Sequence, residues 1–352
     1  MIGLSPGSSR LGTLLRVVTA LAAGILVLVI GLEFAGFDSM HALAAMWRGA
    51  FGSWYALSSA TLVRAVPLIL IGLGIAFAFQ AGAFNIGAEG QFYAGAIAAT
   101  WVGLHAALWP PLLAMTLPLL AALVAGGLWI AVPIWLRHRF GVLEVISTLL
   151  LNFVAEALVS LMVQGPLQES RGVYPQSDPV AITSRLPFLS GTRLHWGILV
   201  ALLLAGILAL IRSRTLLGFR FRAVGANPRA AVVSGRLRVG RWIGYALLVS
   251  GALAGFAGGL EISGVTCALF QNLSPGYGFT GIAVALLARL DPIGIVGTGI
   301  LFAALETGAA AMQREAGVPS VAVYVVEAVI IIVVLIGDSM GRRSRPLVER
   351  PA

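Results

Sequence analysis

The sequence contains no lysine and only one cysteine, and each absence excludes a class of site. All 23 basic residues are arginine, so the lysine that a phosphate-binding loop of the G-x-x-x-x-G-K-[ST] type requires is missing. We therefore expect any ATP and magnesium to be bound by another chain. The single cysteine, Cys267, excludes a disulfide within the chain and a thiolate metal cluster. We expect no cofactor and no metal here.

Charged residues of either sign are also scarce. They make up 11% of the chain, against roughly 25% in an average soluble domain. Hydrophobic residues make up 59%, and they form long runs that do not alternate in polarity, which argues against a β-barrel. Because lipid cannot pair open strand edges, such runs predict membrane-spanning helices.

The hydrophobic runs predict an all-α, polytopic membrane protein of about ten helices in two loosely similar halves with broken helices. The first run lacks a clear cleavage site and is interpreted as a retained span. The predicted spans are 13–35, 60–80, 84–105, 109–136, 142–164, 194–212, 242–263, 278–290, 292–312 and 319–338.

The arginines predict which way the chain crosses the membrane. With both termini in the cytoplasm, 17 of the 23 arginines lie on the cytoplasmic side, as the positive-inside rule requires. The permease domain is then 13–341, between cytoplasmic tails 1–12 and 342–352. Loop 165–193 is external and would form a lid or a docking surface.

The cytoplasmic loop 212–241 carries eight arginines and no acidic residue. This charge suits anionic lipid, but the loop also contains a helix signal, because Asn227-Pro228 can begin a helix and Gly235 can end it. The loop is therefore interpreted either as a lipid contact or as a docking site for a cytoplasmic partner.

Two interrupted segments point to a transport route. Placing Arg64 at the outer interface leaves only about 24 Å of helix as far as Gln80, so the break at Ala81-Gly82 is expected at membrane depth. Irregular backbone there must line protein or water. A second break precedes the short predicted span 278–290. The simplest interpretation of the other carboxyls in the spans is an interhelical hydrogen bond. These include Glu156, Glu261, Glu306 and Glu327. The glycines at 126, 127, 251, 255, 258 and 259 are interpreted as close helix packing.

Four motifs, in order, resemble those of a known family. They are Ala-Phe-Asn-Ile-Gly-Ala-Glu-Gly-Gln at 83–91, Glu-Val-Ile-Ser-Thr-Leu-Leu-Leu-Asn at 144–152, and the stretches 222–235 and 276–287. The chain resembles the permease subunits of bacterial ABC importers of the branched-chain amino acid, simple sugar and nucleoside superfamily, and most of all the nucleoside branch.

The resemblance implies a permease subunit in a bacterial inner membrane that moves a small hydrophilic solute, a nucleoside first and a simple sugar next. It implies ATPase subunits, an extracytoplasmic solute-binding protein and a second, similar permease, with a heterodimer favoured over a homodimer. No nucleic-acid partner is implied. The expected translocation path comprises Asn85, Glu89, Gln91, Ser147, Thr148, Asn152, Tyr277 and Thr280. The expected ATPase-coupling residues are Arg222, Gly225, Asn227, Pro228, Ala230, Ala231 and Gly235.

Two other functions are compatible with a polytopic chain. An ion-coupled secondary transporter would also need broken helices, although the acid-free loop 212–241 favours docking. An intramembrane enzyme is less favoured, because His41, His105, His138 and His195 all lie near span ends and no nucleophile–base pair stands out. We therefore predict a transporter subunit rather than an enzyme.

Overall fold

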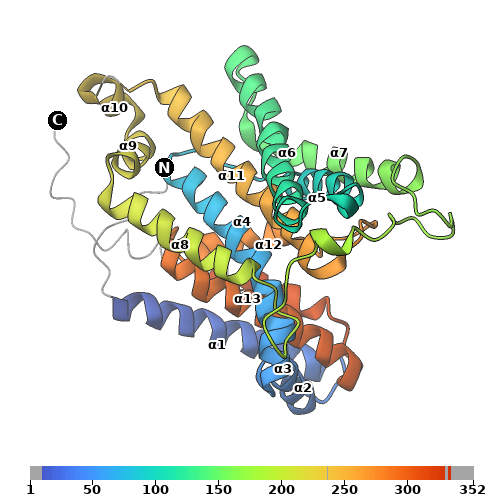
Figure 1. Cartoon of the computed structure of the whole chain (residues 1–352). Helices are drawn as coiled ribbons and strands as arrows, with labels where there is room; N and C mark the ends of the chain where they lie inside the picture. The colour runs from blue at the N-terminus through green and yellow to red at the C-terminus, as the bar shows by residue number, and fades with distance from the viewer. Residues whose placement is uncertain (1–9, 236, 330–331, 334–352) are drawn as a thin grey trace. The chain divides into compact units, whose positions relative to one another are not determined.

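The computed structural model describes residues 10–235, 237–329 and 332–333. Helices dominate this part of the chain, and two isolated β-bridges are its only extended pairings. The longer α-helices are α1 (Arg10–Phe34), α2 (Ser39–Phe51), α4 (Leu62–Gln80), α5 (Ala88–Leu104), α6 (Pro111–Phe140), α7 (Glu144–Gln164), α8 (Gly197–Arg214), α9 (Leu216–Ala226), α10 (Pro228–Gly235), α11 (Val239–Glu261), α12 (Tyr277–Leu287) and α13 (Pro292–Ala316). Figure 1 shows them in chain order.

Six helices are long and apolar enough to cross a membrane, within the residues that the structure describes. They are Trp54–Gln80, Pro111–Phe140, Glu144–Gln164, Gly197–Arg214, Val239–Thr266 and Pro292–Ala316, and the shorter segments Leu21–Phe34 and Tyr277–Leu287 are apolar as well. The prediction of a helical, polytopic membrane protein is confirmed. Nine of the ten predicted spans coincide with helices, and the tenth, 319–338, extends beyond the described residues.

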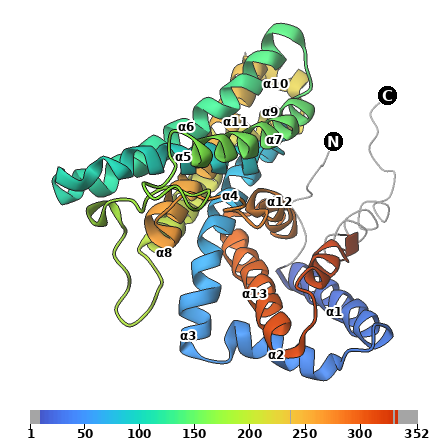
Figure 2. The ribbon, with the colours of Figure 1, turned by 90° about the vertical axis from the view of Figure 1, so that its right-hand side faces the viewer.

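The described part of the chain divides into two compact units, one within 58–303 and the other formed by 10–57 with 304–329 and 332–333. In the larger unit α11 is the central helix and packs against α4, α5 and α6. Figures 1 and 2 show α11 running beside α6. In the smaller unit, Gly49 on α2 faces Ala311 on α13, and Arg48 pairs with Glu315 at 2.8 Å.

Local signals explain where several helices begin and end. Pro111 and Pro292 occupy first-turn positions, where the missing N–H costs nothing. The Asp291 carboxylate accepts a hydrogen bond from the Gly294 N–H at 2.9 Å and so caps α13. Gly141 ends α6 in the left-handed conformation, at φ 69°, which only glycine adopts without cost.

Close glycine contacts hold the centre of the larger unit together. A Cβ on Gly126 would overlap the backbone of Gly251 and Gly255, and a Cβ on Gly258 would overlap the carbonyl of Phe92. The predicted close packing is therefore confirmed for these glycines. Gly127 differs, because a Cβ there would meet only the Ala252 methyl at 3.9 Å.

The structure differs from the sequence prediction in several places. The second span begins at Trp54 rather than near 60, through a π-helical turn at Leu57–Thr61. The segment 36–59 contains α2, which Asp38 caps by accepting from the His41 N–H at 2.9 Å. The predicted span 278–290 is shorter, because α12 ends at Leu287.

The early start of the second span means that Arg64 does not place the break at Ala81-Gly82 at membrane depth. Arg64 does not mark the beginning of a short helix, because Trp54–Gln80 has 27 residues. At 1.5 Å per residue it is about 40 Å long and exceeds the ~30 Å hydrocarbon core. Helix length therefore does not force the break after Gln80 to the membrane centre.

The neighbouring glycines of α6 provide a test of this packing. Changing Gly126 to alanine should lower the melting temperature of the purified protein, since overpacking costs about 1–3 kcal/mol. Gly127→Ala is the matched control and should be neutral or slightly stabilising, because alanine favours helix. Equal melting temperatures for both variants in a detergent thermal-shift assay would contradict the packing of α6 on α11.

Candidate translocation and coupling sites

Asn85 is the centre of the break between α4 and α5. Its side chain is fully buried, and its amide nitrogen donates to Gln91 Oε1 at 2.8 Å and to Ser250 Oγ at 2.9 Å. Its Oδ1 accepts from the Gly87 N–H at 2.9 Å and from Gln91 Nε2 at 3.0 Å. Both amide hydrogens and both lone pairs are thus used within the chain. In this conformation Asn85 has a structural role, because all its side-chain hydrogen bonds are made within the chain. Its contact with solute stays a prediction.

Helix α7 supplies partners to the same break. Asn152 accepts from the Gly90 N–H at 2.8 Å and donates to the Ile86 carbonyl at 2.9 Å. Thr148 accepts from the Ile86 N–H at 3.3 Å. These bonds satisfy backbone groups that an interrupted helix leaves without partners. The motifs at 83–91 and 144–152 are therefore in direct contact.

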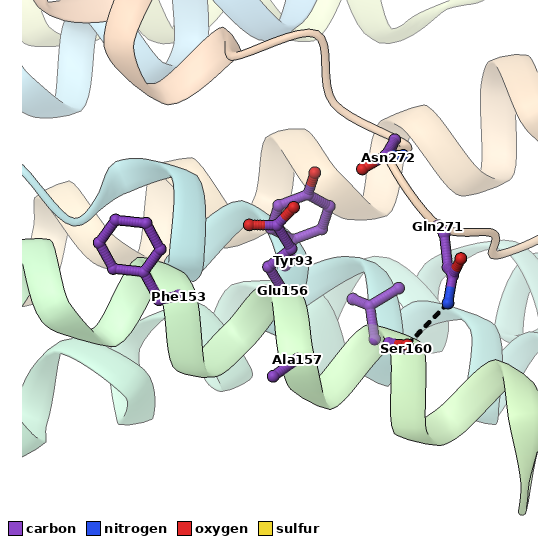
Figure 3. A pocket seen from close by; sticks show the side chains of 8 residues that line it. Tyr93, Phe153, Glu156, Ala157, Ser160, Gln271 and Asn272 are labelled. Atoms are coloured by element: carbon purple, nitrogen blue, oxygen red, sulfur yellow. Dashed lines mark hydrogen bonds between the residues drawn. The ribbon is translucent and has the colours of Figure 1, made fainter.

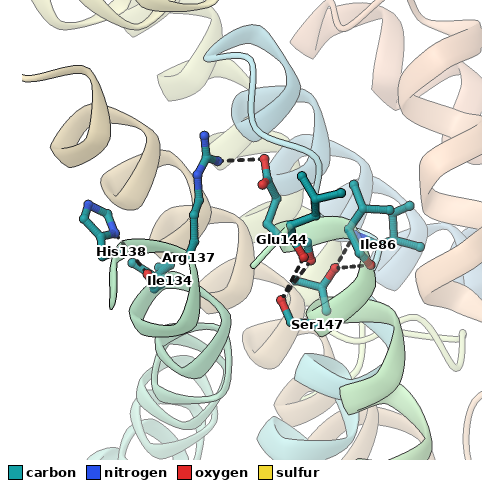
Figure 4. Close-up of polar contacts among 9 residues, drawn as sticks. Ile86, Ile134, Arg137, His138, Glu144 and Ser147 are labelled. Carbon is teal, nitrogen blue, oxygen red and sulfur yellow. Dashed lines mark hydrogen bonds and ion pairs between the residues drawn. The ribbon is translucent and has the colours of Figure 1, made fainter. Parts of the chain in front are cut away.

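Ser147 differs from its neighbour Thr148. Its hydroxyl donates to the carbonyls of Leu143 and Glu144, both at 3.3 Å, and thus back-bonds to its own helix. Figure 4 shows these bonds together with the hydrogen bond from the Ile86 N–H to Thr148 on the first turns of α7. At the same end of α7, Arg137 pairs with Glu144 at 2.7 Å.

Glu89 joins the two interrupted segments. It lies in the first turn of α5, is 6% exposed, and accepts from the Gly278 N–H of α12 at 2.6 Å. Ser274 also hydrogen-bonds this carboxyl, and its oxygen accepts from the Tyr277 N–H at 3.0 Å. A Cβ on Gly278 would overlap the Glu89 backbone, so glycine is what permits the two helix starts to meet. A carboxyl at a helix N-terminus complements the helix dipole.

Tyr277 and Thr280 lie in the first turns of α12 and are both buried. The Tyr277 ring packs against Phe92 of α5, with ring centroids 5.8 Å apart. The structure thus brings six of the eight predicted path residues, all except Ser147 and Thr280, into contacts that connect α5 or the break before it with α7, α11 or α12; Gln91 does so through Asn85.

An open cavity of about 370 Å³ lies beside this joint, between α5, α7 and the segment before α12. Figure 3 shows its polar lining, in which Gln271 donates to Ser160 at 2.7 Å. The lining includes Tyr93, Phe153, Glu156, Ser160, Gln271 and Asn272. None was predicted as a path residue. Periodicity is the signal for Glu156 and Ser160, because they follow Thr148 and Asn152 at intervals of four along α7.

The arginine-rich loop contains two helices, α9 and α10, rather than the one that was predicted. Asn227 Oδ1 accepts from the Ala230 N–H at 3.1 Å, Pro228 begins α10, and Gly235 ends it, which confirms the predicted helix. Ala231 is 4% exposed and packs in a cluster with Ala78 and Val224, whereas Ala230 is exposed. The two alanines predicted to dock together therefore face different surroundings.

Gly225 contacts the break directly. A Cβ at Gly225 would overlap the Gln80 carbonyl, and a Cβ at Gly82 would lie 3.3 Å from the Gly225 Cα. Gly82 has φ +77°, so glycine is needed there for the turn as well. Arg222, one turn earlier, is exposed, and its Nε donates to the Gly218 carbonyl at 3.3 Å. The sequence could not reveal that Gly225 meets its own chain.

The loop 165–193 is bound to the segment that follows α11. Backbone bonds join Ser177 to Leu269, Val180 to Cys267 and Leu186 to Ser263, each at 2.8 Å. His195 ends this loop just before α8, is 1% exposed, and its Nδ1 accepts from the Gly197 N–H at 3.1 Å. Burial lowers the pKa of His195 from its ordinary 6.5 to about 4.

Because of the lowered pKa of His195, we expect the free energy of unfolding to decrease in acid. The unfolded chain binds a proton near pH 6.5 that the folded chain does not bind until about pH 4. Stability from this residue is therefore complete above pH 6.5 and is lost as the pH falls toward 4, by at most about 3 kcal/mol. Melting curves of the purified protein across this range should show the loss.

The control variants separate His195 from other acid effects. His195→Asn keeps an acceptor for the Gly197 N–H without titrating, so its melting temperature should depend less on pH. His105→Asn, at an exposed position, should behave as the unaltered protein does. Identical pH dependence in the His195→Asn protein would disprove this role.

Comparison with known proteins identifies the family. Residues 57–335 match the family model described as the branched-chain amino acid transport system / permease component. The chain is 39% identical to the guanosine ABC transporter permease protein NupP of Bacillus subtilis, over 93% of each chain. It is 36% identical to the glucose ABC transporter permease protein TsgB13 of Haloferax volcanii, over 93% of this chain and 87% of that protein. It is 32% identical to the nucleoside ABC transporter permease protein NupB of Lactococcus lactis, over 89% and 88%. The chain belongs to this family of ABC transporter permease subunits.

Proposed function

We propose that this chain is one of two similar permease subunits of an importer that carries a nucleoside into the cell. Membership of the family makes the chain a transporter subunit rather than an enzyme, and it implies an ATPase and a solute-binding protein as partners. Nucleosides are preferred over sugars because NupP and NupB are both named for nucleoside transport, while TsgB13 is named for glucose. The two permeases form a heterodimer.

The observation that carries the mechanism is the backbone contact between Gly225 and the end of α4. It connects the acid-free, arginine-rich segment α9–α10 to the break that Asn85 stabilises. A rigid contact of this kind passes a displacement of α9 on to the start of α5. The ATPase therefore binds α9–α10, and the lipid-contact interpretation of this loop is not needed.

The face available to the ATPase differs from the predicted one. Ala231 lies on the inner face of α10, where it is buried in the chain's own core and not available to a partner. Arg229, Ala230, Val232 and Val233 are exposed, and Val233 is 85% exposed. Apolar side chains flanked by arginine suit an ATPase groove with acidic edges.

The membrane orientation follows from the same assignment. If the ATPase binds α9–α10, this segment is cytoplasmic, and so are the two termini at 1–12 and 342–352. Loop 165–193 then faces outward, where a solute-binding protein delivers the solute. The membrane is the inner membrane of a bacterium. The path residues Asn85, Glu89, Gln91, Asn152 and Tyr277 lie along the route between these two faces.

The coupling role can be tested at neighbouring alanines. Ala230→Asp should leave the protein folded but lower ATP-dependent uptake at least about tenfold, since a mismatched charge at an interface costs roughly 1.4 kcal/mol or more. Ala231→Asp should instead reduce the amount of folded protein, because it buries a carboxylate. The measurements are radiolabelled nucleoside uptake and ATP hydrolysis by the complete transporter, at matched expression.

Two outcomes would contradict the proposal. Normal uptake by Ala230→Asp would show that α10 does not bind the ATPase. Uptake that persists without ATP but collapses with the ion gradient would identify an ion-coupled carrier. Gly206→Val serves as the insertion control, because nothing lies within 4 Å of a Cβ at that position.

A further inference from the structure

We propose that the cavity between α5, α7 and residues 271–272 is a transit site for a nucleoside. The base lies against Phe153, and the ribose hydroxyls bind the Glu156 carboxylate. This inference rests on the proposed function and adds to it a binding site and the chemistry that the site selects.

Glu156 is the first reason. It is exposed, yet it lies in the middle of α7, a helix apolar enough to cross the membrane. Its exposed neighbours on α7 include Val154 and Leu161, which are apolar. A carboxyl in contact with lipid at that depth would be costly, so it must face water or protein. The cavity that it lines is where such water lies.

The lining chemistry is the second reason. Phe153 is 63% exposed and offers a ring face, while Tyr93 is 4% exposed and closes the cavity from behind. Glu156 supplies an acceptor, which suits the hydroxyls of a ribose. Gln271 and Asn272 supply carboxamides, whose donor and acceptor atoms suit the edge of a base.

The charge of the lining restricts the ligand further. No arginine is among the residues that line the cavity, so a nucleotide phosphate or an amino-acid carboxylate would find no cation there. A volume of about 370 Å³ lies within the range of small-molecule sites. An uncharged compound with one aromatic ring system and several hydroxyls fits these conditions, and a nucleoside is such a compound.

The cavity is also connected to the joint between the broken helices. Tyr93 lies one turn after Glu89 on α5, and Asn272 lies two residues before Ser274, which hydrogen-bonds Glu89. Asn272 has φ 57°, in the left-handed region that asparagine adopts more readily than most residues. This backbone conformation sets the direction of the segment that leads to α12. A movement of α5 against α12 therefore changes the cavity, so the site can release what it binds.

The binding test uses cysteine labelling of the full-length protein in lipid nanodiscs. In a Cys267→Ala background, Ala157→Cys places a thiol on the cavity lining, and Val173→Cys places one at an exposed position of loop 165–193, outside the cavity. Uridine and guanosine, at twice their dissociation constant, should slow labelling of Ala157→Cys by a water-soluble methanethiosulfonate about threefold. They should not slow labelling of Val173→Cys. Adding Phe153→Ala should abolish the protection.

Two labelling results would overturn the site. Equal rates with and without nucleoside would show that the cavity does not bind it. Equal protection by glucose, or protection that survives Phe153→Ala, would show that the aromatic face does not select the ligand.

Uptake by the complete importer separates this inference from the proposed function. Phe153→Ala should reduce nucleoside uptake about five- to tenfold, because one lost aromatic contact to a base has that size, and Phe153→Trp should preserve it. If the unaltered transporter carries nucleoside and Phe153→Ala carries it equally well, the transit site is wrong and the function stands. If the unaltered transporter carries no nucleoside while Ala157→Cys is still protected, the proposed function is wrong and the binding site stands.

Discussion

The structure depends on satisfying the backbone of helices that are broken inside an apolar protein. An interrupted helix leaves N–H and C=O groups that lipid cannot pair, at a cost of several kcal/mol each. Here side chains provide the partners. Asn85 binds the Gly87 N–H, Asn152 binds both Ile86 and Gly90, and Glu89 binds the Gly278 N–H of α12. Together with the bond from Asn85 to Ser250 of α11, they hold α5, α7, α11 and α12 together at one place.

Further contacts link α9 to this interior. Gly225 of α9 touches Gln80, and Gln80 Nε2 donates to the Leu290 carbonyl just after α12, at 2.5 Å. The break that follows Gln80 is fastened to α7 by Thr148 and Asn152. Gln80 thus lies between α9, the break after α4 and the segment that follows α12. Glu156, which lines the cavity, lies one turn beyond Asn152 on α7.

The helices, the family motifs and α10 could be predicted from the sequence because their signals are local. Apolar runs mark spans, and Asn227-Pro228 with Gly235 marks a helix. Other features depend on residues distant in sequence. The Ser250 hydroxyl that binds Asn85 comes from α11, and the cavity combines residues of α5 and α7 with Gln271. The start of the second span was misplaced because Arg64 was treated as a boundary, whereas the structure includes it, half-buried, within a continuous helix.

The most direct test of this account is nucleoside uptake by two variants of Glu89 at matched expression. Glu89→Gln keeps an oxygen that accepts from the Gly278 N–H, so uptake should stay within about fivefold of the unaltered transporter. Replacing a hydrogen bond to a charged group by one to a neutral group costs only about 1 kcal/mol. Glu89→Leu leaves the start of α12 without its partner, and uptake should be lost. Normal uptake by Glu89→Leu would contradict the claim that this bond holds the path together.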